Sequence, residues 1–173
     1  MAERRTRIDK GDGGTIPGGF EIRALASGED RAAFRSLNEE WISRYFVLEE
    51  KDREILGDPD NAILGKGGRI FVVHGEDDVV GCLALIPMGG GVYEISKMAV
   101  SARLRGLGIG RRLLQHAIAE AKALGAKSLF LGSSTKLKNA VHLYESVGFR
   151  HVARETIPDM PYTRADVFME MPL

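Results

Sequence analysis

The sequence predicts an α/β (α+β) fold, with a mixed, mainly antiparallel twisted sheet of about seven strands and helices on both faces. Three observations predict it. Apolar runs of strand length are interspersed with amphipathic stretches of helical period. Short glycine-rich or acidic turns separate the middle strands, which indicates antiparallel neighbours. One amphipathic helix connects two strands, which is the crossover that a parallel pair requires.

The first predicted elements are a strand and two helices. Residues 20–25 alternate like a strand, and Ser27 is a predicted helix N-cap with Asp30 as the acid of a capping box. A short acidic helix is predicted over 49–56, before Pro59. The apolar face of the first helix has helical spacing: Phe34, Leu37, Trp41, Tyr45 and Leu48.

The remaining elements are three strands, then a helix, a strand, a helix and two strands. The helix over 109–124 has one apolar stripe, and Gly125 lies where a C-terminal cap is expected. The predicted ranges are strands 69–74, 79–88 and 92–100, helix 109–124, strand 127–134, helix 138–147, and strands 149–156 and 164–171.

Length and composition predict one folded domain. The chain has 173 residues, of which 44% are hydrophobic and 28% charged, as is ordinary for a globular protein. Residues 1–19 are polar and glycine-rich and lack periodicity, so we expect a flexible N-terminal tail followed by a single domain over 20–173.

The charge balance argues against broad binding to nucleic acid or to an anionic membrane. The formal net charge is zero, so no general field attracts a polyanion. No apolar run approaches the length of a membrane span, and the N-terminus is charged rather than signal-like. The single cysteine, Cys82, lies in an apolar run and is expected to be a buried thiol. A cytoplasmic location is the resulting expectation.

A basic, glycine-rich turn between the strand 92–100 and the helix 109–124 is the most informative segment. Gly108 and Gly110 allow the backbone to approach a ligand closely, and the helix start directs its N–H groups and its positive dipole end at the turn. This combination favours a phosphate or pyrophosphate. Arg111 stands where a P-loop needs lysine, and no G-x-G-x-x-G/A fingerprint is present. The pattern that remains is R-x-x-G-x-G, formed by Arg105, Gly108 and Gly110.

This turn resembles the acetyl-coenzyme A signature of the GNAT superfamily of N-acetyltransferases, and the order of elements is similar from about residue 20 onward. The resemblance implies the acetyltransferase (GNAT) fold with a splayed central parallel strand pair, acetyl-CoA as cosubstrate and no metal. A bulge in the strand before the turn would splay this pair. The implied donor-binding residues are Met98, Ala99, Val100, Arg105, Gly106, Leu107, Gly108, Ile109, Gly110 and Asn139.

Two side chains are the predicted catalytic groups. An alkyl amine has a pKa of roughly 10, so only about one molecule in a thousand is neutral at pH 7 and a base is needed. By resemblance, Glu94 is that base; it is otherwise an anchor for a substrate ammonium or a solvent-facing carboxylate. Tyr144 resembles the tyrosine that protonates the leaving thiolate in this superfamily. Its alternative is plain packing in the core.

The predicted acceptor-binding residues are Tyr45, Glu49, Tyr162 and Arg164. Carboxylates suit a cationic acceptor, and an aromatic face suits an ammonium. Arg164 either binds an acceptor carboxylate or forms an ion pair with Asp166 or Glu155. Trp41 continues the apolar stripe, so a core position is favoured for it.

These features together predict an acetyl-CoA-dependent N-acetyltransferase that moves an acetyl group directly to the amine of a small-molecule or amino-acid-like acceptor. The alternatives are a non-catalytic CoA-binding or sensing module, or the same fold using a larger acyl-CoA. The chain is also similar to the subset of the superfamily found fused to MarR-type domains. It shows no helix-turn-helix, so we expect no nucleic-acid partner and no membrane partner. Dimers are common in the superfamily, which makes a homodimer the oligomer that the resemblance suggests.

Overall fold

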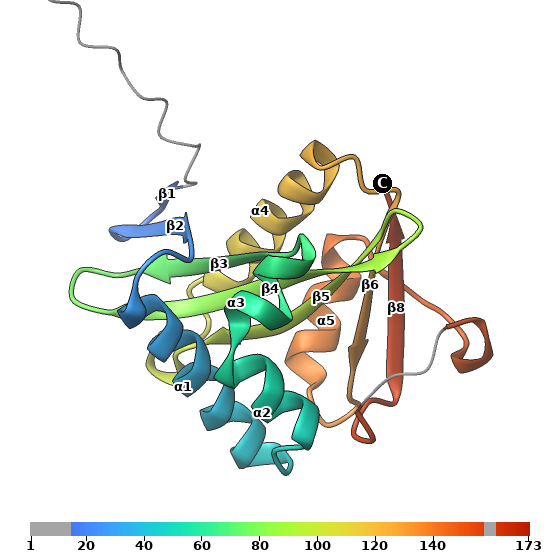
Figure 1. Ribbon diagram of the computed structural model, residues 1–173, viewed down its shortest axis with the longest axis horizontal. Helices are drawn as coiled ribbons and strands as arrows, with labels where there is room; N and C mark the ends of the chain where they lie inside the picture. Colours follow the sequence, from blue (N-terminus) through green and yellow to red (C-terminus); the bar gives the residue numbers. More distant parts are fainter. Residues whose placement is uncertain (1–14, 158–161) are drawn as a thin grey trace, which may run out of the picture.

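The computed structural model describes residues 15–157 and 162–173, which form one eight-stranded sheet with helices on both faces (Figure 1). The strands lie in the order β1-β2-β3-β4-β5-β6-β8-β7. Their bounds are β1 Thr15–Ile16, β2 Phe20–Ala24, β3 Arg69–His74, β4 Val79–Gly89, β5 Val92–Val100, β6 Ser128–Ser133, β7 Arg150–His151 and β8 Val167–Pro172. The helices are α1 Gly28–Tyr45, α2 Glu50–Gly57, α3 Pro59–Ala62, α4 Ile109–Ala123 and α5 Lys138–Val147, with short 3₁₀ turns at Leu64–Lys66, Ala102–Leu104 and Arg154–Thr156.

The predicted fold class is confirmed. Neighbouring strands are antiparallel except β5 and β6, which run parallel and are connected by α4. The sheet has one strand more than the predicted number because Thr15–Ile16 forms a two-residue edge strand, β1. The predicted capping box also forms: the Asp30 amide donates to Ser27 Oγ at 3.0 Å, and the Ser27 amide donates to Asp30 Oδ2 at 3.2 Å.

Three predicted boundaries need correction. Residues 15–19, assigned to the tail, form β1 and a turn, and Ile16 is buried in the core; residues 1–14 lie outside the described residues. The strand predicted over 149–156 is reduced to Arg150–His151, with one more backbone bond from the Val152 amide to the Phe168 carbonyl. Its predicted second half is a 3₁₀ turn, in which the Thr156 hydroxyl and amide both bond to the Ala153 carbonyl. The last strand begins at Val167 rather than at residue 164.

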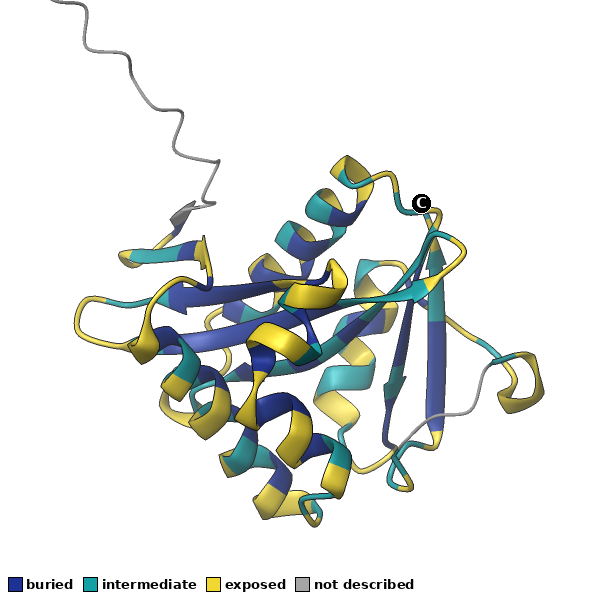
Figure 2. Cartoon of the chain, viewed as in Figure 1, coloured by how far each residue is buried: buried dark blue, intermediate teal, exposed yellow. Residues whose placement is uncertain are grey.

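Two apolar layers lie on opposite faces of the sheet. Along β3 and β4, alternate side chains point to different layers, as the strand period requires. Phe71 and Leu83 pack towards α4 and α5, whereas Val72 and Cys82 pack towards α1 and α2. Figure 2 shows the central strands as the most continuously buried part of the chain, with exposed residues on the outer sides of the helices.

A β-bulge interrupts this alternation in β5. Ala84 pairs with Ser96 and Cys82 pairs with Ala99, so Leu83 alone faces two residues, Lys97 and Met98. One extra residue reverses the faces of every side chain after it. Ile95 and Ala99, four residues apart, accordingly pack in opposite layers.

Candidate active site

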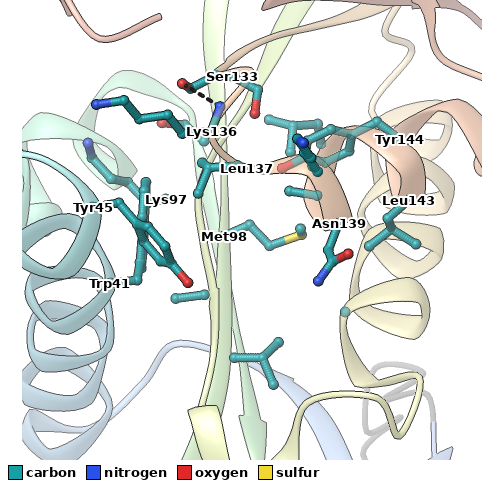
Figure 3. Close-up of a pocket in the computed structure, with 18 of the residues that line it drawn as sticks. Trp41, Tyr45, Lys97, Met98, Ser133, Lys136, Leu137, Asn139, Leu143 and Tyr144 are labelled. Atoms are coloured by element: carbon teal, nitrogen blue, oxygen red, sulfur yellow. Dashed lines mark hydrogen bonds between the residues drawn. The ribbon is translucent and has the colours of Figure 1, made fainter.

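A cavity of about 770 Å³ opens where β5 and β6 separate. The two strands pair only at Val92–Glu94 with Ser128–Phe130, and beyond this point the edge of β5 that faces β6 lines the cavity. Figure 3 shows Trp41, Tyr45 and Lys97 on one side of Met98, and Asn139, Leu143 and Tyr144 of α5 on the other. The predicted splayed parallel pair is therefore present, and it creates the cavity.

Lys97 is held in an unusual conformation at the bulge. Its φ of 52° is the only positive value among the described non-glycine residues. Such a backbone costs about 1–3 kcal/mol and persists only where its surroundings hold it. Asn38 Nδ2 donates to the Lys97 carbonyl at 3.2 Å and to Cys82 Sγ at 3.3 Å. Cys82 is fully buried, and burial raises the pKa of its thiol to about 12, so it stays neutral.

The glycine-rich turn presents an open backbone to the cavity. Gly106 and Gly108 have φ values of 83° and 81°, and a Cβ added to either meets no protein atom within 4 Å. Gly108 is the N-cap of α4 and supplies no side-chain cap. The first N–H groups of α4 thus lack side-chain capping, which suits an anion. Leu107, predicted in the donor site, is 61% exposed and does not line the cavity.

The other predicted donor-site residues line the cavity: Met98, Ala99, Val100, Arg105, Gly106, Gly108, Ile109, Gly110 and Asn139. Gly110 packs closely against α5, since a Cβ there would lie 3.5 Å from Leu143 Cδ2. Their contact with a donor stays a prediction.

Glu94 lines the cavity at the point where β5 leaves β6. Burial raises the pKa of its carboxyl, and the positive charge of Lys97 and a hydrogen bond from Ser96 oppose this rise only in part. A carboxylate with a raised pKa accepts a proton more readily near neutral pH than an exposed one.

Tyr144 reaches the same cavity from α5 and is 8% exposed. Burial raises the pKa of its hydroxyl to about 12, so the proton is retained at neutral pH. The ring also packs edge-on against Phe149, with 6.0 Å between centroids. The position of Tyr144 is compatible with both predicted roles, proton donor in the cavity and packing in the core.

A buried ion network occupies the side of the cavity beneath α2. Asp52 is completely buried and accepts from Lys97 Nζ at 2.7 Å. Arg164 donates to the two oxygens of Asp52 at 2.7 and 2.8 Å. Burial alone would raise the pKa of Asp52, but the hydrogen bonds from Arg164 and Lys97 outweigh it and lower the pKa from 3.8 to about 2. The prediction that Arg164 pairs with Asp166 or Glu155 is wrong; Asp166 instead binds Thr135.

The remaining predicted acceptor residues surround this network. The Tyr162 hydroxyl accepts from Lys97 Nζ at 2.9 Å, and its ring centroid lies 4.4 Å from both Lys97 Nζ and Arg164 Cζ. Glu49 accepts from Arg164 at 3.1 Å and lines an adjoining groove of about 510 Å³ rather than the main cavity. Tyr45 lines both spaces.

The network residues Asp52 and Lys97 were not predicted as site residues. Lys97 did carry a signal, because a lysine in a central strand must find a partner if it is buried. Asp52 carried a local signal, because its place three residues after Glu49 is that of the acid in a capping box. In the structure the Glu49 amide donates to Asp52 Oδ2 at 2.9 Å.

Within 15–157 and 162–173, no helix has the length and apolar character needed to cross a membrane. Over the same residues, no group of three or more His, Cys, Asp or Glu side chains is placed to hold a metal ion.

Comparison with known proteins identifies the family. The model of the Acetyltransferase (GNAT) family matches residues 31–149. The chain belongs to this family. The predicted family and the predicted acyltransferase class are thereby confirmed.

Several relatives bear N-acetyltransferase names. The uncharacterized N-acetyltransferase C1271.07c of Schizosaccharomyces pombe is 28% identical over 159 residues, which cover 87% of this chain and 97% of that protein. The IAA acetyltransferase of Azospirillum brasilense is 36% identical over 108 residues, covering 61% of this chain and 68% of that one. With YjgM of Escherichia coli (34% identical) the match covers half of this chain and only 53% of the relative.

Solved structures share the fold. An acetyltransferase of the GNAT family from Staphylococcus aureus superimposes with a TM-score of 0.82 at 20% identity, covering 89% of this chain and 99% of that one. A Bacillus subtilis acetyltransferase solved in complex with CoA has a TM-score of 0.66 at 21% identity, covering 88% and 97%.

Proposed function

We propose that this protein is an acetyl-CoA-dependent N-acetyltransferase that transfers the acetyl group directly to the primary amine of a small molecule. The observation that carries the proposal is a single cavity that joins three features. These are the uncapped start of α4, a half-buried carboxylate with a raised pKa at Glu94 and a protonated phenol at Tyr144.

The donor side of the cavity fits coenzyme A. Gly106 and Gly108 leave open space over a left-handed backbone, and the N–H groups at the start of α4 suit a pyrophosphate. The exposed edge of β5 after Glu94 suits a pantetheine arm, since backbone amides there are not used by β6. Bound acetyl-CoA would supply the activated thioester. A Bacillus subtilis protein of the same fold that was solved with CoA supports this choice of donor.

Two side chains, Glu94 and Tyr144, would then carry out the proton transfers. Glu94 takes one proton from the acceptor ammonium, and the free amine nitrogen forms a bond to the thioester carbonyl carbon. An N–H of the β5 edge stabilises the negative charge on the carbonyl oxygen. As the carbon–sulfur bond breaks, Tyr144 gives its proton to the sulfur, which leaves as a thiol. The acylated nitrogen gives up its second proton, which restores the Tyr144 hydroxyl and leaves a neutral amide. Transfer is direct because the one cysteine of the chain is buried and neutral.

The test is Glu94→Gln, assayed by thiol release from acetyl-CoA with a primary amine acceptor. We expect kcat/KM to fall by about 100-fold or more at pH 7 and by much less near pH 10, where the acceptor deprotonates itself. Glu39→Gln is the control, because Glu39 lies on α1 outside the cavity lining and pairs with Arg35. A pH profile that is unchanged in Glu94→Gln would refute the base role.

A further inference from the structure

The acceptor end of the cavity is the wall formed by Trp41, Tyr45, Phe46, Lys97, Tyr162 and Arg164, opposite α5. Its two cations are both bound by carboxylates. Arg164 Nη1 donates to Glu49 and to Asp52, and Nη2 donates to Asp52. Lys97 Nζ donates to Asp52 and to the Tyr162 hydroxyl. Because Asp52 is completely buried, these bonds are shielded from water and are costly to exchange.

The balance of charge over Glu94 and the ion network is negative. Glu49, Asp52 and Glu94 carry three negative charges when ionised, and Lys97 and Arg164 carry two positive ones. Glu94 is the carboxylate to which neither Lys97 nor Arg164 donates a hydrogen bond, although Lys97 lies near enough to act on it electrostatically. An ammonium group beside Glu94 would neutralise the excess charge.

A carboxylate on the same carbon as this ammonium would be poorly accommodated. It would enter the cavity beside Glu94, where Lys97 and Arg164 already donate to Asp52 and Glu49. A buried anion without a cationic partner costs several kcal/mol. Of the other cations of the lining, Arg105 and Arg111 belong to the glycine-rich turn, and Lys138 is exposed at the start of α5. Lys136 lies at the rim of the acceptor end, with its Nζ 5.3 Å from the Phe46 ring centroid, and it is exposed, so its attraction for a carboxylate is weakened by water.

The rest of the wall is apolar. Trp41 and Phe46 pack edge-on with 6.4 Å between centroids, and the Arg164 guanidinium lies 5.9 Å from Phe46 and 4.4 Å from Tyr162. The aromatic rings therefore pack against Arg164, the predicted partner of an acceptor carboxylate, and their remaining surface lines the cavity.

From these contacts we infer that the acceptor is a primary amine on an apolar body, without a carboxylate on the amine-bearing carbon. Arylalkylamines fit this class and α-amino acids do not. The inference rests on the proposed function, because it takes the Glu94 end of the cavity as the acceptor site. It makes Glu49 and Asp52 specificity-determining residues that act by occupying Arg164 and Lys97.

Two matched pairs of compounds test it: tryptamine with tryptophan, and phenethylamine with phenylalanine. Each pair differs only by the carboxylate. Binding to the CoA-loaded full chain is measured by calorimetry, and turnover is measured separately by thiol release from acetyl-CoA. We expect each amine to bind at least about 100-fold more tightly than its amino acid, because carboxylates already bind both cations of the ion network, Lys97 and Arg164.

The outcomes separate this inference from the proposed function. Equal or tighter binding of the amino acid, or no binding of either compound, overturns the inference whatever the turnover. Tighter binding of the amines without thiol release supports the inference about the site and overturns the proposed acetyl transfer.

A variant provides a second, independent measurement. Glu49→Gln removes one of the charges that occupy Arg164 while leaving Asp52 in place, so the amine preference should fall by about 10-fold. Glu54→Gln is the matched control, because Glu54 is exposed on the same helix and binds only Lys51 among the described residues. An unchanged preference in Glu49→Gln, or an equal fall in Glu54→Gln, overturns the assignment of specificity to the network.

Discussion

Asp52→Asn is the substitution whose effect follows most directly from the structure. Asp52 is completely buried, and the lowering of its pKa from 3.8 to about 2 measures how strongly its ionised form is stabilised on folding. At about 1.4 kcal/mol per pKa unit, this is about 2.5 kcal/mol of stability at pH 7. The substitution also leaves Lys97 and Arg164 without their shared anion, so we expect a total loss of about 3–5 kcal/mol.

The pH dependence follows from the sign of the pKa shift. Because the folded pKa lies below the unfolded one, the stabilisation is fully present above about pH 4 and is lost as the pH falls towards 2. About 0.8 kcal/mol of it remains at pH 2.5. The free-energy gap between wild type and Asp52→Asn, measured by urea unfolding, should therefore narrow by about 1.7 kcal/mol between pH 7 and pH 2.5.

Glu54→Gln serves as the control for removing a carboxylate from α2. Its partner Lys51 is exposed, so the change should cost less than about 0.5 kcal/mol. Two results would show that the network does not stabilise the fold as the contacts indicate. One is a difference in unfolding free energy below about 1 kcal/mol between wild type and Asp52→Asn at pH 7. The other is a difference that does not become smaller in acid.

Three further substitutions and one control substitution test the donor side. Gly108→Ala and Gly125→Ala should each lose about 1–2 kcal/mol of stability, since both glycines have φ near 80° and open space around them, but only the first lines the cavity. Calorimetry should show CoA affinity reduced at least about 10-fold only in Gly108→Ala; equal affinities would contradict the pyrophosphate site. Tyr144→Phe should lower kcat by about 100-fold with little change in the KM for acetyl-CoA, and a retained kcat would assign the proton to another donor. Asn38→Ala should cost about 1–3 kcal/mol and weaken CoA binding through the Lys97 bulge; lost stability with unchanged affinity would separate the two effects.

Local patterns predicted most of the fold. Four of these elements depend only on short-range periodicity or on residues a few positions apart. They are the capping box at Ser27, the strands 69–74 and 92–100, and the helix 138–147. The crossover helix α4 between β5 and β6 then required a parallel pair. The predictions failed where side-chain contacts overrode propensity, as in the 3₁₀ turn at Arg154–Thr156, where the Thr156 hydroxyl bonds to the Ala153 carbonyl within a predicted strand.

The acceptor end depends on contacts between distant segments, and no local pattern specified them. Lys97 and Asp52 are 45 residues apart, and Arg164 and Asp52 are 112 apart. The sequence predicted Arg164 near the acceptor site, between the last two strands, and Arg164 does line the cavity; its contact with an acceptor stays a prediction. It could not reveal that two carboxylates already occupy the guanidinium, because that depends on how α2 packs beside β5.

The bulge at Lys97 connects the two ends of the cavity. Its left-handed backbone reverses the alternation of β5, so that Ile95 and Ala99 pack on opposite sheet faces. The Lys97 ammonium donates a hydrogen bond to Asp52, and the Lys97 carbonyl accepts one from Asn38. The backbone that would hold the donor and the network that would select the acceptor therefore share one residue. Weakening the Asp52 contact should relax the strained backbone, and Asp52→Asn is thus expected to reduce CoA affinity as well as the preference for amines over amino acids.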